Sequence, residues 1–318
     1  MNQQVCEQVV RFGPNGILVG VLSCPIAPVS PDSSGVLLVN AGLLHRVGPN
    51  RLYVSLARDL AGLGFPVLRF DFAGLGDSGR HDDNAPLEQT VVRDIDEALT
   101  FASERTGVRS WLLVGHCSGA IISTYVAQSD PRVSAVLAIN FAPVLDPNWV
   151  TVDRDEKNAR YFLRYYLKSA FKNPENWKRL LSGRVHYRRI VGVIAGGVVR
   201  AAARTTLIRL RSRLSVRPAR DETSSAAGQH LIDLEKVVRR GARVHFVFSE
   251  KNAGLDYLRA ATSGRLDTLL SAGSVGMEII PRSDHLFSTL DGQLRLREIV
   301  RAFAESVQHT RESIGATV

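Results

Sequence analysis

The chain is poor in cysteine, with Cys6, Cys24 and Cys117 the only three among its 318 residues. So sparse and odd a count excludes a disulfide framework, and the spacing matches no metal-ligand pattern. We therefore expect no metal site. The low cysteine usage also fits a reducing compartment, so we expect a cytoplasmic protein.

Long apolar runs and targeting signals are lacking as well. No stretch of about 18 uncharged apolar residues is present, so we expect no transmembrane helix. Residues 190–203 are apolar, but the segment is short and Arg200 interrupts it. The first residues show no basic stretch followed by an apolar core, so we expect no signal peptide.

Acidic charge is scarce in one part of the chain. The net charge is +9, with 40 Lys and Arg against 31 Asp and Glu. Residues 151–220 carry 18 Lys and Arg against four Asp and Glu, a net charge of +14, so the rest of the chain is at −5. An excess of positive charge favours an acidic partner. Because the excess lies in residues 151–220, we expect such a partner to bind this segment.

Short apolar segments alternate with amphipathic ones along most of the chain. This alternation predicts a mostly parallel sheet covered by helices on both faces. The eight predicted strands are residues 9–12, 17–23, 36–40, 66–72, 111–114, 133–139, 244–249 and 277–281. The predicted helices are residues 51–64, 87–105, 120–127, 231–240, 256–261, 266–271 and 293–306.

The alternation stops between the sixth and seventh strands. We therefore predict one core domain, residues 1–142 and 231–318, with a basic helical cap inserted at residues 143–230. Ligands of open α/β sheets bind at the carboxyl ends of the strands, and the cap is expected above that edge.

The strongest local motif is Gly115-His116-Cys117-Ser118-Gly119, between an apolar strand and a helix. It has the spacing of the G-x-S-x-G nucleophile elbow, with cysteine in place of the central serine. Gly115 and Gly119 let strand and helix approach closely. The sulfur of Cys117 then lies at a helix N-terminus, whose dipole favours the thiolate. A buried structural cysteine is the alternative interpretation. Ser118 is the rival nucleophile, but one position beyond the tip its side chain should point away.

With this motif the chain resembles the α/β-hydrolase superfamily. The resemblance implies an α/β-hydrolase fold, with a mostly parallel eight-stranded sheet, helices on both faces and a helical cap after the sixth strand. It also implies the chain order nucleophile, acid, histidine. His285 follows the last predicted strand in Ser283-Asp284-His285-Leu286, which looks like the family's histidine loop. We expect His285 to move the proton of the thiol and of the leaving group.

The acid of the triad is the least clear part of the resemblance. Asn252 stands after the seventh strand where the family usually has Asp. Asp256 ranks first as the replacement, followed by Glu250, then by Asn252 itself and Asp146. Papain-like enzymes use Asn as the orienting residue, and a thiolate–imidazolium pair depends less on an acid than serine does.

The resemblance places the oxyanion hole at two backbone N–H groups. One belongs to Ser118, and the other, by position, to Leu43 in the loop after the third strand. The loop 40–51, the segment Arg69-Phe70-Asp71 and the loop 74–78 look like those of a bacterial hydrolase subgroup from secondary-metabolite and polysaccharide pathways. Loop 74–78 lacks the G-x-G-x-x-G order at the start of a helix that is typical of a phosphate-binding loop.

A cysteine nucleophile indicates the reaction class. Its attack on a thioester gives another thioester, so the exchange is nearly thermoneutral and runs both ways. Similar cysteine-containing proteins of this fold act as acyl or aminoacyl transferases between carrier proteins, and dienelactone hydrolases open a lactone. We therefore expect a cysteine-dependent acyltransferase or thioesterase. The alternatives are a hydrolase of a small ester or lactone, and a catalytically weak binding protein.

The basic cap segment suits an acidic carrier protein bearing a phosphopantetheine arm, or coenzyme A. Lys and Arg recur there at helical spacing among aromatic residues, so an anionic membrane surface is the next choice, and a solvated face without a partner remains open. No nucleic-acid-binding module is recognisable, so we expect no nucleic-acid partner. No bound cofactor is expected, and the sequence carries no signal for an oligomeric state.

Overall fold

A computed structural model of the chain describes residues 5–42, 44–83, 85–141, 233–250, 252, 254–262 and 265–315. These residues all belong to one of the two units into which the chain divides, residues 1–150 with 230–318. The predicted cap, residues 143–230, lies outside the described residues.

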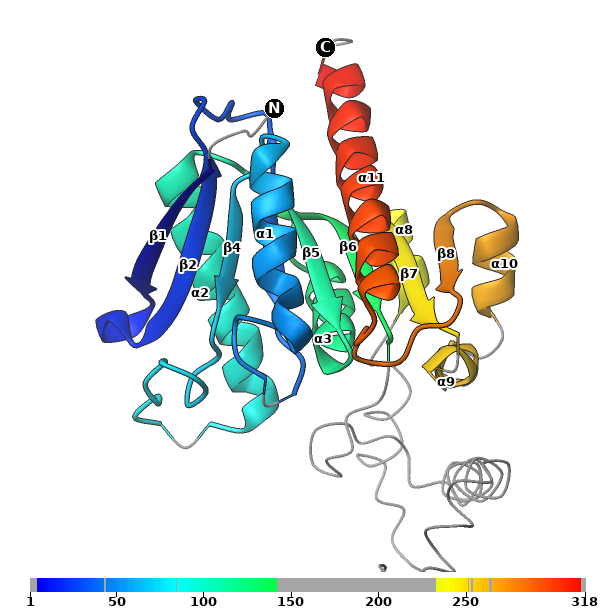
Figure 1. Cartoon of the computed structure of the whole chain (residues 1–318), viewed down its shortest axis with the longest axis horizontal. Helices are drawn as coiled ribbons and strands as arrows, with labels where there is room; N and C mark the ends of the chain where they lie inside the picture. Colours follow the sequence, from blue (N-terminus) through cyan, green and yellow to red (C-terminus); the bar gives the residue numbers. More distant parts are fainter. Residues whose placement is uncertain are drawn as a thin grey trace, which may run out of the picture. The chain divides into compact units, whose positions relative to one another are not determined.

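A single eight-stranded sheet is the centre of this unit, in the order β1-β2-β4-β3-β5-β6-β7-β8 (Figure 1). β2 pairs antiparallel with both β1 and β4, and the remaining neighbours pair in parallel. The predicted mostly parallel eight-stranded sheet is therefore confirmed. The strands are β1 (Val5–Phe12), β2 (Leu18–Pro25), β3 (Ser34–Val39), β4 (Val67–Phe70), β5 (Ser110–His116), β6 (Val133–Ile139), β7 (Arg243–Ser249) and β8 (Val275–Ile280).

Helices cover both faces of the sheet. α1 (Leu52–Gly62) and α11 (Leu290–Gly315) lie on one face, and α2 (Leu87–Thr106), α3 (Ser118–Ala127) and α8 (Leu234–Arg239) on the other (Figure 1). The short helices α9 (Gly254–Ala261) and α10 (Arg265–Ser271) join β7 to β8. Each face thus has its own apolar core, as expected for parallel strands buried on both sides.

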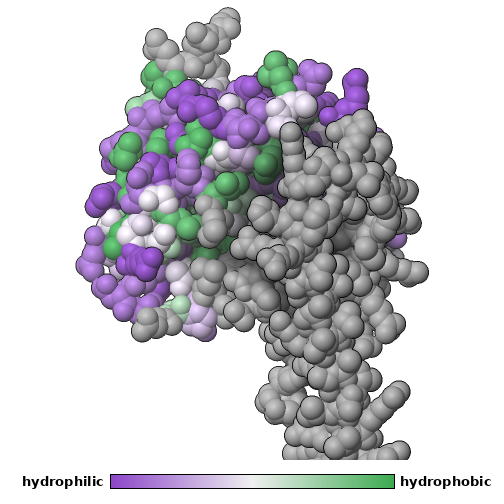
Figure 2. All heavy atoms as spheres, turned by 60° about the horizontal axis from the view of Figure 1, so that its bottom comes forward, coloured by the Kyte–Doolittle hydropathy of each residue, from purple (hydrophilic) through white to green (hydrophobic). Residues whose placement is uncertain are grey.

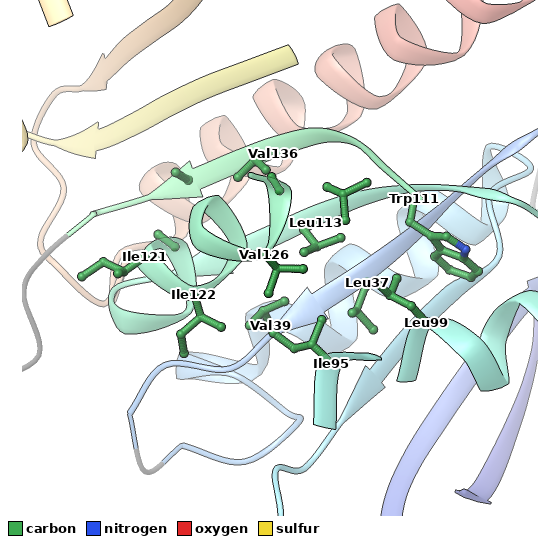
Figure 3. Packing of buried hydrophobic residues seen from close by; sticks show 14 of the residues in the cluster. Leu37, Val39, Ile95, Leu99, Trp111, Leu113, Ile121, Ile122, Val126 and Val136 are labelled. Atoms are coloured by element: carbon green, nitrogen blue, oxygen red, sulfur yellow. The ribbon is translucent and has the colours of Figure 1, made fainter. Parts of the chain in front are cut away.

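Alternation along the central strands divides their side chains between the two cores. Val36 and Leu38 of β3 pack on the side of α1 and α11, whereas Leu37 and Val39 pack on the side of α2 and α3. Figure 3 shows Leu37, Val39 and Leu113 on the side of the sheet that the helix residues Ile95, Ile122 and Val126 cover. Burial of each such side chain contributes about 1.5–3 kcal/mol, so the strands that carry the site are firmly fixed.

Most predicted elements are present, with shifted ends. α11 extends well beyond the predicted residues 293–306, because its polar second half gives little apolar periodicity. Short 3-10 helices at Pro14–Gly16 and Pro49–Arg51 were not predicted.

Within the described residues, no helix is long and apolar enough to cross a membrane. The same part of the chain holds no cluster of three His, Cys, Asp or Glu side chains arranged to bind a metal ion.

Candidate active site

Cys117 stands at the tip of a strained turn between β5 and α3. Its φ of 55° and ψ of −117° are rarely adopted by a residue with a side chain. The N–H of Cys117 donates to the carbonyl of Ile139 on β6 at 2.8 Å, which holds the turn against the sheet. Such strain persists only where the surroundings enforce it, and it collects at functional sites.

Two glycines make this turn sterically allowed. A Cβ on Gly115 would lie 2.2 Å from the carbonyl oxygen of Gly119, so the strand and the helix touch through backbone alone. A Cβ on Gly119 would lie 2.4 Å from the carbonyl oxygen of Val39 at the end of β3. The first turn of α3 is therefore wedged between β5 and β3, and the elbow geometry expected from the sequence is present.

The electrostatics of Cys117 differ from the sequence-based expectation. The side chain is half-buried, and burial raises the pKa of its thiol, while a hydrogen bond from the N–H of Ser118 opposes that rise. The expected preference for thiolate at the helix N-terminus is therefore wrong in its net direction. The physical reason is that lost solvation of the thiolate outweighs the stabilising backbone N–H.

Ser118 turns its hydroxyl away from the tip. Ser118 is buried, and its Oγ accepts a hydrogen bond from the N–H of Gly42 at 2.6 Å. Its side chain thus ties the loop after β3 to the start of α3. Its N–H remains the candidate oxyanion donor beside the thiol of Cys117. Leu43, the expected second donor, lies outside the described residues.

His285 lies in the loop after β8, next to the residue that precedes the nucleophile. Its ring centroid is 4.9 Å from that of His116. Burial lowers the pKa of His285, and the charge of Asp284 works in the opposite direction. Among the hydrogen bonds between described residues, none joins the Cys117 thiol to the His285 ring.

Three strand ends converge on His285. Nε2 of His116, the last residue of β5, donates to the His285 carbonyl at 2.7 Å. Nδ2 of Asn140, just after β6, donates to the same carbonyl at 2.8 Å. Nδ2 of Asn252, after β7, lies 2.9 Å from Nδ1 of the His285 ring. The backbone and the ring of His285 are therefore both held from the carboxyl edge of the sheet.

The sequence analysis did not identify His116 and Asn140 as residues of this site. His116 is fully buried, and burial lowers its pKa to about 4, so it is neutral near pH 7 with its proton on Nε2. Asn140 is fully buried too, and its Oδ1 accepts from the N–H of Ser249 at 2.7 Å. The only available signal was a polar residue directly after an apolar parallel strand, the edge where sites form.

The candidate acids occupy different places. Asn252 is the residue that contacts Nδ1 of His285. Asp256, ranked first from the sequence, lies exposed in the first turn of α9. The carboxylate of Glu250 accepts from the N–H of Arg282 at 2.8 Å. Asp146 lies outside the described residues. The side chain that contacts the His285 ring is therefore the amide of Asn252 and not the carboxylate of Glu250.

The loops after β3 and β4 are clamped together at the same edge. Asp71 is fully buried and accepts from the N–H of Arg46 at 2.6 Å, from the Arg46 guanidinium, and from the N–H of Asp77 at 3.0 Å. A Cβ on Gly76 would lie 2.2 Å from the Asp71 carboxylate, so the loop folds tightly over this charge. This buried ion pair fixes the rim formed by residues 40–48 and 71–79.

Figure 2 turns the edge with the loops towards the viewer. On its described part, hydrophobic side chains are interspersed with hydrophilic ones. Leu44 and Leu286 are exposed large apolar residues of the loops after β3 and β8. Leu286 directly follows His285, so the histidine loop itself exposes an apolar side chain.

The family model described as serine aminopeptidase, S33, matches residues 34–190, just under half of the chain. No curated protein matches it.

Solved structures of similar fold cover nearly the whole chain. A serine hydrolase homologue from Coxiella burnetii has a TM-score of 0.51 at 15% identity, covering 95% of this chain and 97% of its own. Proline iminopeptidase from Mycobacterium smegmatis has a TM-score of 0.56 at 14% identity, covering 96% and 99%. A structure from a study of carboxylesterases of Nitrososphaera gargenis has a TM-score of 0.51 at 15% identity, covering 95% and 100%. Together with the sheet order and the elbow, these similarities show that the chain has the α/β-hydrolase fold.

Proposed function

We propose that the protein is a cysteine-dependent acyltransferase or thioesterase that acts on acyl or aminoacyl thioesters. The observation that carries the proposal is the position of Cys117 at the tip of the strained elbow, with His285 held beside the preceding residue. The elbow is the place of the nucleophile in this fold, and a thiol there forms a covalent acyl-enzyme.

Each residue of the site has a proposed role. The Cys117 thiol gives its proton to water, and the resulting thiolate attacks the carbonyl carbon of the donor thioester; the departing donor thiolate takes a proton back from water. The N–H of Ser118 then stabilises the oxyanion, with the expected N–H of Leu43 as the second donor. Collapse of the tetrahedral intermediate expels the donor thiolate and leaves the acyl group on Cys117. One thioester bond is exchanged for another, so this step is nearly thermoneutral and reversible.

The basic segment supports a carrier as the source of the acyl group. Residues 151–220 carry a net charge of +14, and an acidic carrier protein with a phosphopantetheine arm, or coenzyme A, would be attracted to it. This part of the proposal rests on the sequence, as does the expectation of a cytoplasmic enzyme in a secondary-metabolite pathway. Because the carrier holds the substrate, the enzyme needs no cofactor of its own.

The test is intact-protein mass spectrometry after incubation with a panel of acyl-CoA and acyl-carrier-protein thioesters. Cys117→Ala is the control, because it removes the sulfur and keeps the other site residues. A mass gain that the control lacks is the expected result, and the best donor then names the acyl class. No adduct and no turnover with any donor would refute the thioester proposal.

A second candidate is the hydrolysis of a small ester or lactone. The similarity to a structure from a study of carboxylesterases favours it, and the same nucleophile and oxyanion donor would serve. Turnover of p-nitrophenyl esters without any response to thioesters would select this alternative. A catalytically weak binding protein, favoured by Asn252 in the acid position, would turn over neither class.

A further inference from the structure

The amide of Asn252 has a fixed orientation. Its Oδ1 accepts a hydrogen bond from the N–H of Gly254, the first residue of α9, at 2.7 Å. A backbone N–H is always a donor, so the amide oxygen must face Gly254. The NH2 group is therefore the one that faces Nδ1 of His285 at 2.9 Å. Because an amide NH2 only donates, Nδ1 must accept.

This contact selects the tautomer of His285. A neutral imidazole carries one proton, and with Nδ1 as acceptor that proton is on Nε2. A carboxylate at position 252 would accept from both Gly254 and Nδ1–H, which would leave Nε2 free to take a proton. Asparagine in the acid position of a serine triad lowers kcat by about 10⁴-fold through this wrong tautomer.

The charged imidazolium is disfavoured at the same time. Its Nδ1–H would point at the NH2 of Asn252, so two donors would face each other. The nearby carboxylate of Asp284 accepts from the Ser288 hydroxyl and from the N–H of Leu286, and His116 and Asn140 contact the His285 backbone as neutral groups. Among the described residues, no other hydrogen-bond acceptor faces Nδ1 of the ring. The charge of Asp284 favours the imidazolium, but burial has the larger effect and lowers the pKa of His285.

We infer that the acyl group on Cys117 is passed to a thiol and is protected from water by Asn252. The inference rests on the proposed function. In transfer, an acceptor thiolate attacks the acyl carbonyl, a new carbon–sulfur bond forms, the bond to Cys117 breaks, and Cys117 leaves as thiolate. No proton moves, so no base is needed. A few per cent of an ordinary thiol is ionised at pH 7, which supplies the attacking species.

Water reacts differently. To attack the acyl-enzyme it must give up a proton, and Nε2 of His285 already carries one. General-base assistance contributes about 10²–10⁴-fold, and of the two reactions that discharge the acyl-enzyme its loss slows only hydrolysis. Asn252 is thus a positioning residue that sets the ratio of transfer to hydrolysis.

The test compares the wild type with Asn252→Asp. Asp keeps the acceptor for Gly254 and gives Nδ1 an acceptor, so the variant preserves the local fold. Asn15→Asp is the matched control, because it adds the same charge to an exposed residue in the turn between the edge strand β1 and β2. The donor probe is octanoyl-N-acetylcysteamine, and the acceptor probe is N-acetylcysteamine.

Two readouts are used. The first is the lifetime of the acyl-enzyme by intact-protein mass spectrometry, in buffer and with the acceptor. The second is the ¹⁵N chemical shifts of the His285 ring, which report the protonated nitrogen without any substrate. We expect a wild-type adduct that persists in buffer and is discharged by the acceptor, and the same behaviour in Asn15→Asp. In Asn252→Asp we expect hydrolysis at least about 10²-fold faster and a proton on Nδ1.

Equal adduct lifetimes in wild type and Asn252→Asp, or a wild-type ring with its proton on Nδ1, would overturn the inference. The absence of an adduct in every variant would instead refute the proposed function. The ring shifts separate the two failures, because they test the tautomer independently of acylation.

Discussion

Gly115→Ala tests the elbow on which the account is built. The added Cβ would lie 2.2 Å from the carbonyl oxygen of Gly119, 2.4 Å from its carbonyl carbon and 2.6 Å from the nitrogen of Ala120. Ordinary contacts begin at 3.4 Å, so the first turn of α3 must retreat by about 1 Å. The helix cannot retreat freely, because Gly119 is itself packed on the Val39 carbonyl.

We expect this variant to lose about 3 kcal/mol of unfolding free energy, at the upper end of overpacking costs. Acylation should fall on the order of 10²-fold, because a shift of about 1 Å misplaces the sulfur. Urea denaturation and adduct formation rates measure the two effects. Gly79→Ala is the control, since its Cβ would meet Ile17 Cβ at an ordinary 3.4 Å. Wild-type stability and acylation in Gly115→Ala would refute the close strand–helix contact.

Three further predictions concern charge and protonation. Asp71→Asn should lower the free energy of unfolding, measured by urea denaturation, by about 3 kcal/mol, because the Arg46 guanidinium loses its buried partner. Asp77→Asn removes only the exposed partner of Arg46 and should cost under about 1 kcal/mol. Equal losses in the two variants would contradict the buried ion pair between Arg46 and Asp71. Between pH 6.5 and pH 4, His116 alone should lower the free energy of unfolding by about 3 kcal/mol, because the unfolded chain takes up a proton that buried His116 takes up only near its pKa of about 4. His116→Gln should therefore lose about 3 kcal/mol less than the wild type over this pH range. Equal losses in the two proteins would refute this prediction. The rate of Cys117 labelling by iodoacetamide, followed by peptide mapping, should rise about tenfold per pH unit from pH 6 to pH 8, because the raised pKa keeps the thiol neutral in this range. A rate that levels off below pH 7 would indicate a thiolate–imidazolium ion pair and contradict this prediction.

The elbow was predictable because its cause is local. Gly115 and Gly119 stand two residues on either side of Cys117, and the apolar strand before them is evident from the sequence. The sheet was predictable for a related reason, since short apolar runs separated by helical segments have few ways to bury both faces.

The partner of His285 was not predictable in the same way. Ranking by chemistry favoured Asp256, but α9 begins at Gly254 and places Asp256 in its exposed first turn. Asn252 reaches the ring because its other amide atom accepts from Gly254, a turn interaction that a residue-type ranking does not weigh. Asn140 could not be predicted as a site residue, because its role is a hydrogen bond to His285, which lies 145 positions later in the chain.

The direction in which the fold shifts the pKa of Cys117 could not be predicted from the sequence, for a physical reason. The helix N-terminus is visible in the sequence, whereas the burial of the Cys117 side chain is a property of the folded chain. When desolvation and a backbone N–H oppose each other, only the folded structure tells which is larger.

The central claim is that the sulfur of Cys117 carries the acyl group. The most direct measurement is tandem mass spectrometry of the acylated protein after proteolysis, before and after treatment with neutral hydroxylamine, which cleaves thioesters far faster than oxyesters. The account predicts an acyl group on Cys117 that hydroxylamine removes. An acyl group that resists hydroxylamine and maps to Ser118, or one on Cys6 or Cys24, would contradict it.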